Sequence, residues 1–270
     1  MSKKVVILGA AGKMGQTLIH CILEKKVSGL DLVGAIDLWD DENLGKDVGI
    51  TLGLEKCNVN LTSDLNTVGP NADVIIDFSS HVSTSGNAER IASWNTAWVI
   101  GTTGLNEDEL EIINNVSKQI PVVMSGNMSL GINILCNLVE SASKKLRDKG
   151  FDIEILEKHH NQKKDAPSGT ALMLGESVAS GYEIDLDKSK RDGRSGLVGK
   201  RNHNEIGFHS IRGGDIIGDH SVLFAGSGEM LEFSHRATDR NVFALGALVA
   251  AKWLVDKNTG LYSMNDVLDL

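Results

Sequence analysis

Apolar residues in the first half of the chain recur in short runs that are separated by helical patterns. Five runs are apolar on both faces of an extended strand: "KKVVILG", "LDLVGAID", "ADVIIDFSS", "TAWVIGTTG" and "IPVVMSGN". Between them, "QTLIHCILEKK" and "NEDELEIINNVSKQ" have the spacing of helices with one apolar face. Strands buried on both faces and separated by helices are typical of parallel sheets. The pattern predicts an α/β domain with a Rossmann-type, doubly wound parallel sheet.

The pattern changes at Ser129. The segment "SLGINILCNLVESASKKLRDK" predicts one long amphipathic helix, and "FDIEILEKHH" alternates apolar with acidic residues, as a half-exposed strand does. Three more strand-like segments, joined by short glycine-bearing turns, predict an antiparallel meander: "EIGFHSIRGG", "GDHSVLFAG" and "EMLEFSHRA". We expect a second, α+β domain with an open mixed or antiparallel sheet.

The last helical segment, "DRNVFALGALVAAKWLVDK", is apolar enough to pack back onto the first domain. We therefore predict a discontinuous dinucleotide-binding domain, residues 1–128 and 240–270. Residues 129–239 would form a domain for substrate binding and oligomerisation. The polar, glycine-punctuated segment "DLDKSKRDGRSGLVGKRNHN" predicts a mobile loop within it.

Composition narrows the class of protein. The 270 residues are 41% hydrophobic and 23% charged, which is usual for a globular protein, and the net charge is −9. An acidic chain disfavours binding to nucleic acid or to anionic membranes. The apolar run before Gly9 is too short for a signal peptide or a membrane span, and three scattered cysteines without a CxxC pattern indicate reduced thiols. We expect a cytoplasmic protein.

A glycine triplet lies where the first strand passes into a helix, in "VVILGAAGKMGQTL". Gly9, Gly12 and Gly15 allow a tight turn and a close approach of a pyrophosphate, and the helix start offers free N–H groups. The spacing GxxGxxG is looser than the dinucleotide fingerprint GxGxxG, and a purely structural turn is the alternative. A phosphate loop fits less well, because Met14 follows Lys13 where that motif needs Ser or Thr.

Asp37 ends the second predicted strand, where an acidic residue typically binds the adenosine ribose. The next residues, Leu38 and Trp39, are not basic, so a 2′-phosphate would meet a carboxylate without a countercharge. We predict that NADH is preferred and that NADPH use is possible. For Asp37 alone, a solvated loop carboxylate is the alternative. The small-residue segments Gly101–Gly104 and Ser125–Ser129 follow later strands, where a nicotinamide ring could lie close to backbone.

A basic cluster precedes the next predicted helix, in "EKHHNQKKDAPSGTA". Pro167 is expected in the first turn of that helix, with Ser168 as its cap. The N–H groups of Ser168, Gly169 and Thr170 would suit a carboxylate, and Lys163 would add charge. A second carboxylate of the ligand would bind near His160 or at a distant arginine, and we choose Arg240 for that arginine. The two binding points together would form a dicarboxylate site.

Lys164 and the two histidines also have simpler interpretations. Lys164 is best explained as a solvated side chain. Adjacent histidines on a strand point in opposite directions, so His159 and His160 are poor joint metal ligands, and no carboxylate or thiol lies at a convincing ligand spacing. We predict no metal site.

From Val5 to Leu270 the chain resembles the 4-hydroxy-tetrahydrodipicolinate reductase family, also called dihydrodipicolinate reductase. The matching motifs are "GAAGKMG", "VIIDFS", "VIGTTG", "EKHHNQKKDAPSGTA" and "RGGDIIGDH". The resemblance implies NAD(P)H-dependent reduction of a cyclic dicarboxylate in lysine and diaminopimelate biosynthesis, by a homotetramer assembled through open sheets. Many members have a basic residue directly after the acidic one at the end of the second strand. This chain has Leu38 at that position, which disfavours NADPH.

The resemblance also implies roles for single residues. His159 and Lys163 match the catalytic pair, one of which supplies a proton, and His160, Gly169 and Thr170 match substrate contacts. The implied cofactor contacts are Gly9, Ala10, Ala11, Gly12, Lys13, Met14, Gly101, Thr102, Thr103, Ser125, Gly126, Asn127 and Met128. Two other functions remain open: a nicotinamide-binding sensor that catalyses nothing, and a dehydrogenase acting on a linear amino-acid aldehyde.

Overall fold

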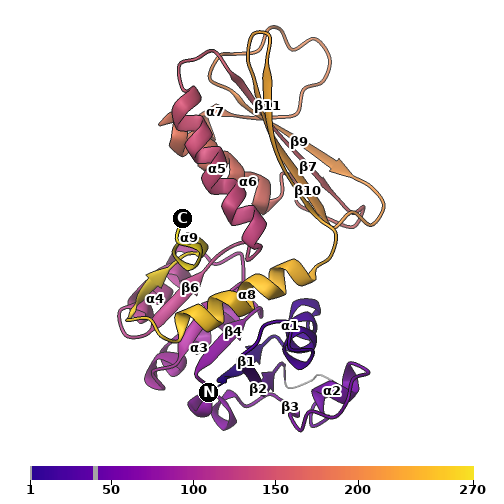
Figure 1. The fold of residues 1–270 in the computed structure, drawn as a ribbon, viewed down its shortest axis with the longest axis vertical. Coiled ribbons are helices and arrows are strands. Elements are labelled where there is room, and N and C mark those ends of the chain that lie inside the picture. The colour runs from indigo at the N-terminus through magenta and orange to yellow at the C-terminus, as the bar shows by residue number, and fades with distance from the viewer. Residues whose placement is uncertain (1, 39–41) are drawn as a thin grey trace. The chain divides into compact units, whose positions relative to one another are not determined.

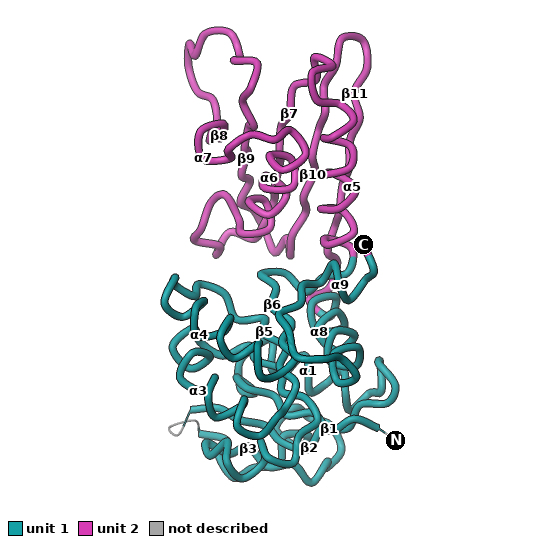
Figure 2. Tube along the Cα trace, turned by 90° about the vertical axis from the view of Figure 1, so that its left-hand side faces the viewer, with its two compact units in different colours: residues 1–130, 241–269 teal, residues 131–240, 270 magenta. Residues whose placement is uncertain are grey.

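The computed structural model describes residues 2–38 and 42–270. Its chain divides into two compact units, which Figures 1 and 2 show. Unit 1 comprises residues 1–130 and 241–269, and unit 2 comprises residues 131–240 with residue 270. Trp39, which entered the prediction of cofactor preference, lies outside the described residues.

Unit 1 is built on a sheet in which every described strand pairs in parallel with its neighbours. The strand order is β12-β6-β5-β4-β1-β2-β3. The strands are β1 (Lys3–Leu8), β2 (Leu30–Ile36), β3 (Leu61–Thr62), β4 (Val74–Asp77), β5 (Ala97–Ile100), β6 (Pro121–Met124) and β12 (Gly260–Tyr262). The order reverses direction between β1 and β4, and ligands of such sheets bind beside that point.

Helices cover both faces of this sheet, which confirms the predicted doubly wound fold (Figure 1). The helices of unit 1 are α1 (Lys13–Leu23), α2 (Val48–Thr51), α3 (His81–Ser93), α4 (Glu107–Ser117), α8 (Asn241–Leu254) and α9 (Met264–Leu268). Val5 and Ile7 of β1 pack with α1 and α8, whereas Val6 and Leu8 pack with α3 and α4. Successive strand residues point to opposite faces, so a strand that is apolar at every position must be covered twice.

Unit 2 contains a mixed sheet with the strand order β11-β10-β7-β9-β8. The strands are β7 (Asp152–His159), β8 (Lys190–Asp192), β9 (Ile206–Arg212), β10 (Gly218–Ala225) and β11 (Met230–Ala237). β10 is antiparallel to β7 and β11, but β9 is parallel to both β7 and β8. The predicted mixed sheet is present, but the predicted meander is wrong, because β7 lies between β9 and β10. Alternation along a strand marks its buried face and carries no information about which neighbour it pairs with.

One face of this second sheet is covered and the other is open. Helices α5 (Leu130–Leu146) and α6 (Gly169–Tyr182) pack on the covered face around Ile153, Ile155 and Phe224 (Figure 1). The alternation predicted for "FDIEILEKHH" is confirmed, because every second residue of β7 is buried. That alternation continues past the isoleucines, so the buried face of β7 ends in Glu157 and His159.

The segment predicted as a mobile loop is partly structured. It begins with the short helix α7 (Leu186–Ser189), which Asp185 caps, and continues into the edge strand β8. Beyond β8, Arg194 and Arg201 donate hydrogen bonds to Glu154 on the open face of the sheet, over 2.8 and 2.9 Å. The sequence suggested a loop because its polar and glycine residues are typical of turns, whereas ion pairs to a distant strand hold it here.

The described residues form no helix that is both long and apolar enough to cross a membrane. The cysteines of the chain, Cys21, Cys57 and Cys136, form no disulfide with one another.

Candidate functional site

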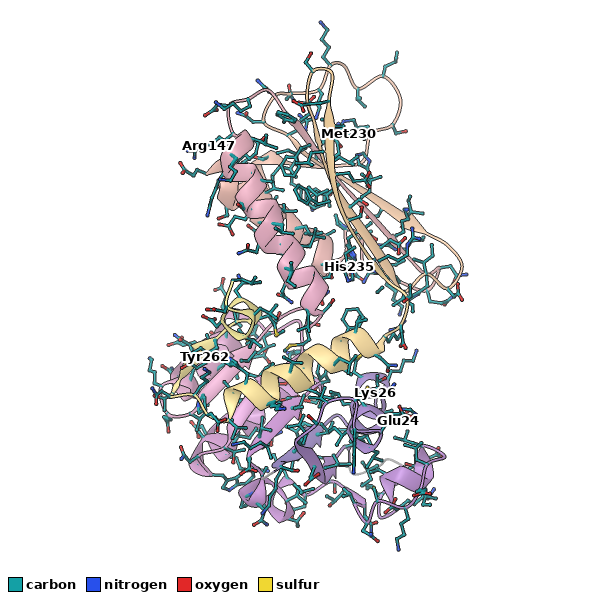
Figure 3. The ribbon with its side chains drawn as sticks, viewed as in Figure 1. Glu24, Lys26, Arg147, Met230, His235 and Tyr262 are labelled. Carbon is teal, nitrogen blue, oxygen red and sulfur yellow. The ribbon has the colours of Figure 1, made fainter. Side chains whose placement is uncertain are left out.

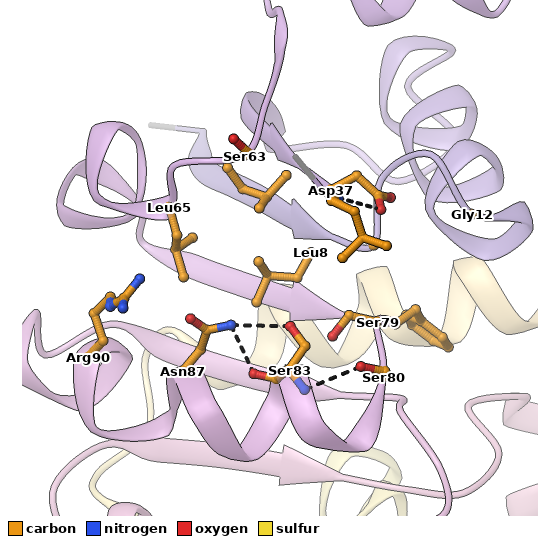
Figure 4. Close-up of a pocket in the computed structure, with 14 residues that line it drawn as sticks. Leu8, Gly12, Asp37, Ser63, Leu65, Ser79, Ser80, Ser83, Asn87 and Arg90 are labelled. Atoms are coloured by element: carbon orange, nitrogen blue, oxygen red, sulfur yellow. Dashed lines mark hydrogen bonds between the residues drawn. The ribbon is translucent and has the colours of Figure 1, made fainter. Parts of the chain in front are cut away.

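A pocket of about 480 Å³ opens in unit 1 at the carboxyl ends of the strands (Figure 4). Its lining includes Gly9 and Gly12 from the glycine turn and Asp37 from the end of β2. It extends past the end of β4 to Arg90 on α3. The pocket therefore lies beside the reversal of strand order between β1 and β4, where open α/β sheets bind ligands.

The glycine turn leaves backbone free to approach a ligand. Gly9 has φ +79°, and a side chain there would collide with the carbonyl of Phe78 at the end of the neighbouring strand. Gly15 lies against the backbone of Gly9, so helix α1 packs directly on the turn. Helix α1 begins after Gly12 without any side chain to cap it, whereas Ser80 caps α3. The first N–H groups of α1 are thus available to an anion.

Asp37 is joined to this turn. One carboxylate oxygen, Oδ2, accepts the N–H of Ala11 at 2.6 Å, and Oδ1 accepts the N–H of Leu38 at 2.8 Å. Leu38 itself is 66% exposed. Asp37, the residue predicted to bind the ribose, therefore lies beside the glycine turn, as a dinucleotide site requires.

The other predicted cofactor residues also follow strands of the same sheet. Ala10 and Ala11 continue the turn, and Lys13 and Met14 begin α1. Gly101, Thr102 and Thr103 follow β5, and Ser125, Gly126, Asn127 and Met128 follow β6. These two loops share the carboxyl edge with the pocket but do not line it. Met128 is only 2% exposed and packs in the core, so only its backbone is suited to a ligand.

Two of these loop residues have structural reasons for their identity. A side chain at Gly101 would collide with the ring of Phe78. Thr102 donates its hydroxyl to the buried Asp77 at 3.1 Å. Burial raises the pKa of Asp77, and its hydrogen bonds to Ser79 and Thr102 only partly offset that effect. Asp77 thus ties the end of β4 to the loop after β5.

Sequence reasoning missed the α3 side of the pocket. Ser80, Ser83, Asn87 and Arg90 contribute to the lining, and Figure 4 shows them along one side of it. Among the described residues, the guanidinium of Arg90 has no ion-pair partner. For Ser80 the signal was present in "VIIDFSS", because polar residues that follow a buried strand lie at the ligand-binding edge of the sheet.

The candidate site of unit 2 is centred on the end of β7. Glu157 and His159 share the buried face of the strand because they are two residues apart. Nδ1 of His159 lies 2.6 Å from Oε2 of Glu157. Arg212 of β9 approaches the same carboxylate with both terminal nitrogens, over 2.7 and 2.8 Å. The N–H of Ser168 donates to Oε1 at 3.2 Å, so one carboxylate joins the histidine to the start of α6.

The charges of this cluster are fixed by its burial and its partners. Burial would raise the pKa of Glu157, but the hydrogen bonds from Arg212 and His159 outweigh it and hold that pKa at about 2. Burial lowers the pKa of His159, and the Glu157 carboxylate opposes that effect. Glu157 is consequently ionised near neutral pH and able only to accept hydrogen bonds.

A second buried histidine adjoins the first. His220 of β10 stands directly opposite Glu157 in the sheet, and its ring meets that of His159 edge-on at 5.1 Å between centroids. Nε2 of His220 lies 3.1 Å from the hydroxyl of Ser168. Burial lowers the pKa of His220 to about 4, so the ring is neutral near pH 7. His235 of β11, which Figure 3 labels, is the residue that pairs with His220 in the sheet.

Helix α6 begins as predicted, with one correction. Ser168 is the N-cap, since its hydroxyl accepts the N–H of Ala171 at 3.2 Å, and Gly169 and Thr170 are the first helical residues. Pro167 precedes the cap instead of occupying the first turn. The preference for proline at helix starts does not separate these neighbouring positions without the cap geometry.

The remaining predicted residues are His160, Lys163 and Arg240. His160 follows β7 half-exposed, and Lys163 ion-pairs with Asp165 at 2.9 Å in the turn before α6. Arg240 ends unit 2 and is exposed, and it makes no hydrogen bond or ion pair with any other described residue. Within residues 2–38 and 42–270, no group of three or more His, Cys, Asp or Glu could hold a metal ion.

Glu157, Arg212 and His220 were not predicted, although all three lie in quoted motifs. Glu157 carried a readable signal, because a carboxylate occupies the position where the alternation of β7 calls for a buried residue. The part played by Arg212 and His220 depends on strand pairing, which the sequence pattern did not provide.

Comparison with known proteins identifies the relatives of this chain. The family model for the N-terminus of dihydrodipicolinate reductase matches residues 3–128, and the model for its C-terminus matches residues 131–268. A 4-hydroxy-tetrahydrodipicolinate reductase from Rhodopseudomonas palustris (strain BisB5) is 48% identical over 267 residues, which cover 99% of this chain and 97% of the relative. One from Bradyrhizobium diazoefficiens is 46% identical with the same coverage.

Solved structures share the fold at lower identity. A dihydrodipicolinate reductase from Paenisporosarcina sp. TG-14, with dipicolinate bound, is 23% identical with a TM-score of 0.75, covering 97% of this chain and 98% of that one. An amine dehydrogenase from Mycobacterium smegmatis is 11% identical with a TM-score of 0.62, covering 98% and 96%. Both family models and the level of identity lead to one conclusion: the chain belongs to the dihydrodipicolinate reductase family.

Proposed function

We propose that this protein is a 4-hydroxy-tetrahydrodipicolinate reductase of lysine and diaminopimelate biosynthesis. Loss of water from 4-hydroxy-tetrahydrodipicolinate gives dihydrodipicolinate, which a reduced nicotinamide cofactor then reduces to tetrahydrodipicolinate. One observation carries the proposal from the structure: the Glu157 carboxylate binds both Nδ1 of His159 and the N–H of Ser168. A group able to exchange protons is thereby held beside a helix start suited to an anion.

The substrate is a ring with two carboxylates. One carboxylate is bound at the start of α6, by the N–H groups of Gly169 and Thr170, where the helix dipole favours negative charge. His160 and Lys163 supply hydrogen-bond donors and charge for the second. The solved relative that contains dipicolinate supports this class of ligand. Arg240 is proposed as a further substrate contact, since its guanidinium is exposed and forms no hydrogen bond or ion pair with the described residues.

The nicotinamide cofactor fits unit 1. The uncapped start of α1 and the open backbone of the glycine turn suit a pyrophosphate, and Asp37 suits ribose hydroxyls. We propose that NADH is preferred, since Leu38 gives a 2′-phosphate no countercharge. Arg90 is a cation on the same pocket and supports some use of NADPH.

The chemistry requires a hydride and a proton. A bound reduced nicotinamide would supply the hydride, so dihydrodipicolinate, NADH and one proton give tetrahydrodipicolinate and NAD⁺. Adding hydride to a conjugated imine leaves an electron pair on nitrogen or carbon, and an acid must protonate it. His159 or Lys163 delivers that proton, a contribution of roughly 10²–10⁴-fold to the rate.

Unit 1 is proposed as the dinucleotide-binding domain and unit 2 as the domain for substrate binding and assembly. The open face of the second sheet supports assembly into a homotetramer, because Leu156, Leu223 and Ile211 on that face are only partly buried in the single chain. The lack of disulfides among the cysteines supports a cytoplasmic location.

The deciding experiment is an assay coupled to the preceding synthase, which makes the unstable substrate in place. We expect oxidation of NADH that depends on the synthase, with a lower kcat/KM for NADPH. Stoichiometric NADH binding without turnover would favour a sensor instead. Faster turnover of a linear amino-acid aldehyde would favour a different dehydrogenase.

A further inference from the structure

We propose that Glu157 is a positioning residue, which holds the His159 ring in one tautomer and directs its Nε2 atom at the substrate. This inference rests on the proposed function, and it concerns a residue that touches His159 and not the reacting atoms. It assigns a role in the reaction to the carboxylate and, through it, to Arg212.

Glu157 is a buried carboxylate. The residue is 1% exposed, and a carboxylate removed from water is stable only when its oxygens are paired. Both oxygens are paired here. Oε2 accepts from His159 and Arg212, and Oε1 accepts from Arg212 and from the N–H of Ser168. The carboxylate therefore has a fixed position and a fixed charge.

The hydrogen bond between Glu157 and His159 can run in one direction only. An ionised carboxylate has no hydrogen to donate, so Nδ1 of His159 must donate along the 2.6 Å contact. In the neutral ring the hydrogen then resides on Nδ1, and Nε2 carries the lone pair. In the charged ring Nε2 carries the hydrogen that can be delivered. Either way, Nε2 is the nitrogen that exchanges protons.

Nε2 of His159 lies beside Gly218. A Cβ added at Gly218, the first residue of β10, would lie 3.2 Å from Nε2 of His159. The absence of a side chain at Gly218 keeps this nitrogen uncovered on that side. The ring edge of His220 contacts His159, and the charged groups facing the His159 ring are Glu157, Lys163 and Arg212.

A purely structural ion pair between Glu157 and Arg212 is the competing explanation. It would cost stability when broken but would leave the tautomer of His159 unchanged. The chain contains a matched control for it. Glu154, on the opposite face of the same strand, accepts from Arg194 and Arg201 and lies 2.7 Å from Nε2 of His209. Its pKa is also held at about 2, against the effect of burial, by Arg194, His209 and Arg201.

The test combines nuclear magnetic resonance of ¹⁵N-labelled histidine rings with steady-state kinetics, on the full chain. His159→Asn assigns the His159 signals. In the unmutated protein we expect hydrogen on Nδ1 when the ring is neutral. In Glu157→Gln the ring should titrate at lower pH and lose that single tautomer. The kcat should fall roughly ten-fold or more, as part of a general acid's contribution, with a smaller change in KM.

Glu154→Gln should leave the His159 signals as they are in the unmutated protein. The proposal is overturned if Glu157→Gln does the same, or if the neutral ring of the unmutated protein carries its hydrogen on Nε2. The second outcome is decisive even when Glu157→Gln does not fold. The ring measurements need no turnover, so an inactive protein would refute the proposed reductase while the tautomer still decides the role of Glu157.

Discussion

The N–H of Ala11 donates to Oδ2 of Asp37 at 2.6 Å, so one carboxylate closes the glycine turn and faces the pocket beside it. This contact links two elements 26 residues apart in the chain, the end of β2 and the turn after β1. If Asp37 binds the cofactor as proposed, its replacement should affect cofactor binding more than the chemical step.

Replacing Asp37 with Ala should weaken cofactor binding. The change removes the acceptor for Ala11 and the proposed acceptor for the ribose hydroxyls, and a hydrogen bond to a charged group contributes about 1.5–3 kcal/mol. We expect the KM for NADH to rise roughly ten-fold or more, with a smaller change in kcat. Steady-state kinetics with varied NADH measures both. The matched control is Asp73→Ala, because Asp73 accepts the N–H of Lys4 at the opposite end of the sheet. An equal rise in KM in both variants would contradict the assignment.

Leu38→Arg should shift the cofactor preference towards NADPH. An arginine at this exposed position would give a 2′-phosphate the countercharge that it lacks beside Asp37. The quantity to compare is the ratio of kcat/KM for NADPH and NADH, and we expect the ratio to rise. Arg90→Ala should lower the same ratio if Arg90 assists NADPH. A ratio unaffected by Leu38→Arg would place the 2′-position away from residue 38.

Lys163→Ala should reduce turnover by about 10²–10⁴-fold, the usual contribution of a general acid, or of a charge that binds a reacting anion. Lys164→Ala provides the control, because Lys164 is the exposed neighbour with no assigned role. Initial rates in the coupled assay decide the matter. A Lys163→Ala enzyme that works at the rate of the Lys164→Ala enzyme would remove Lys163 from the site.

Ser168→Ala should destabilise unit 2 more than a typical cap deletion. The hydroxyl caps α6 and also pairs with the buried His220, so its loss leaves a histidine nitrogen without a partner. Cap removal alone costs about 1 kcal/mol in the free energy of unfolding, and an unpaired buried group costs about 1–3 kcal/mol more. Measured by urea unfolding, the loss in the free energy of unfolding should be larger for Ser168→Ala than for Asn106→Ala. The second variant removes only the cap of α4 in unit 1. Equal losses would mean that the His220 contact contributes nothing.

Acid should destabilise the protein through Glu154 and Glu157. Both have folded pKa values of about 2, below the ordinary value of 4.5, because their arginine and histidine partners outweigh burial. A group whose pKa is lower in the folded chain than in the unfolded chain stabilises the fold at pH values above its unfolded pKa. That stability is lost as pH falls from about 5 towards 2. Urea midpoints over this range should fall less steeply in Glu157→Gln than in the unmutated protein. Parallel curves would show that Glu157 titrates alike in the folded and unfolded chain.

Local patterns in the sequence were sufficient for much of the fold. Five parallel strands of unit 1 were predicted because runs that are apolar at every position must be buried on both faces. The strands β3 and β12 were not predicted, since two or three residues are too few for any periodicity. The cap of α6 was predicted at Ser168 because its signal lies within a few residues of the helix start.

Local patterns did not reveal how distant segments combine. Alternation along β7 indicates that Glu157 and His159 share a face, and the motif around them places a helix start a few residues later. It does not indicate that β9 brings Arg212 and β10 brings His220 to the same carboxylate. Likewise, nothing near Arg90 in the chain connects it to Asp37, which it joins in one pocket through the packing of α3 against the sheet. The sequence by itself determined which strand and helix faces are buried and which segments carry side chains able to bind or react, because periodicity is a local property. The tertiary structure alone decided which of them meet, because strand pairing and helix packing join residues whose separation along the chain leaves no mark in either segment.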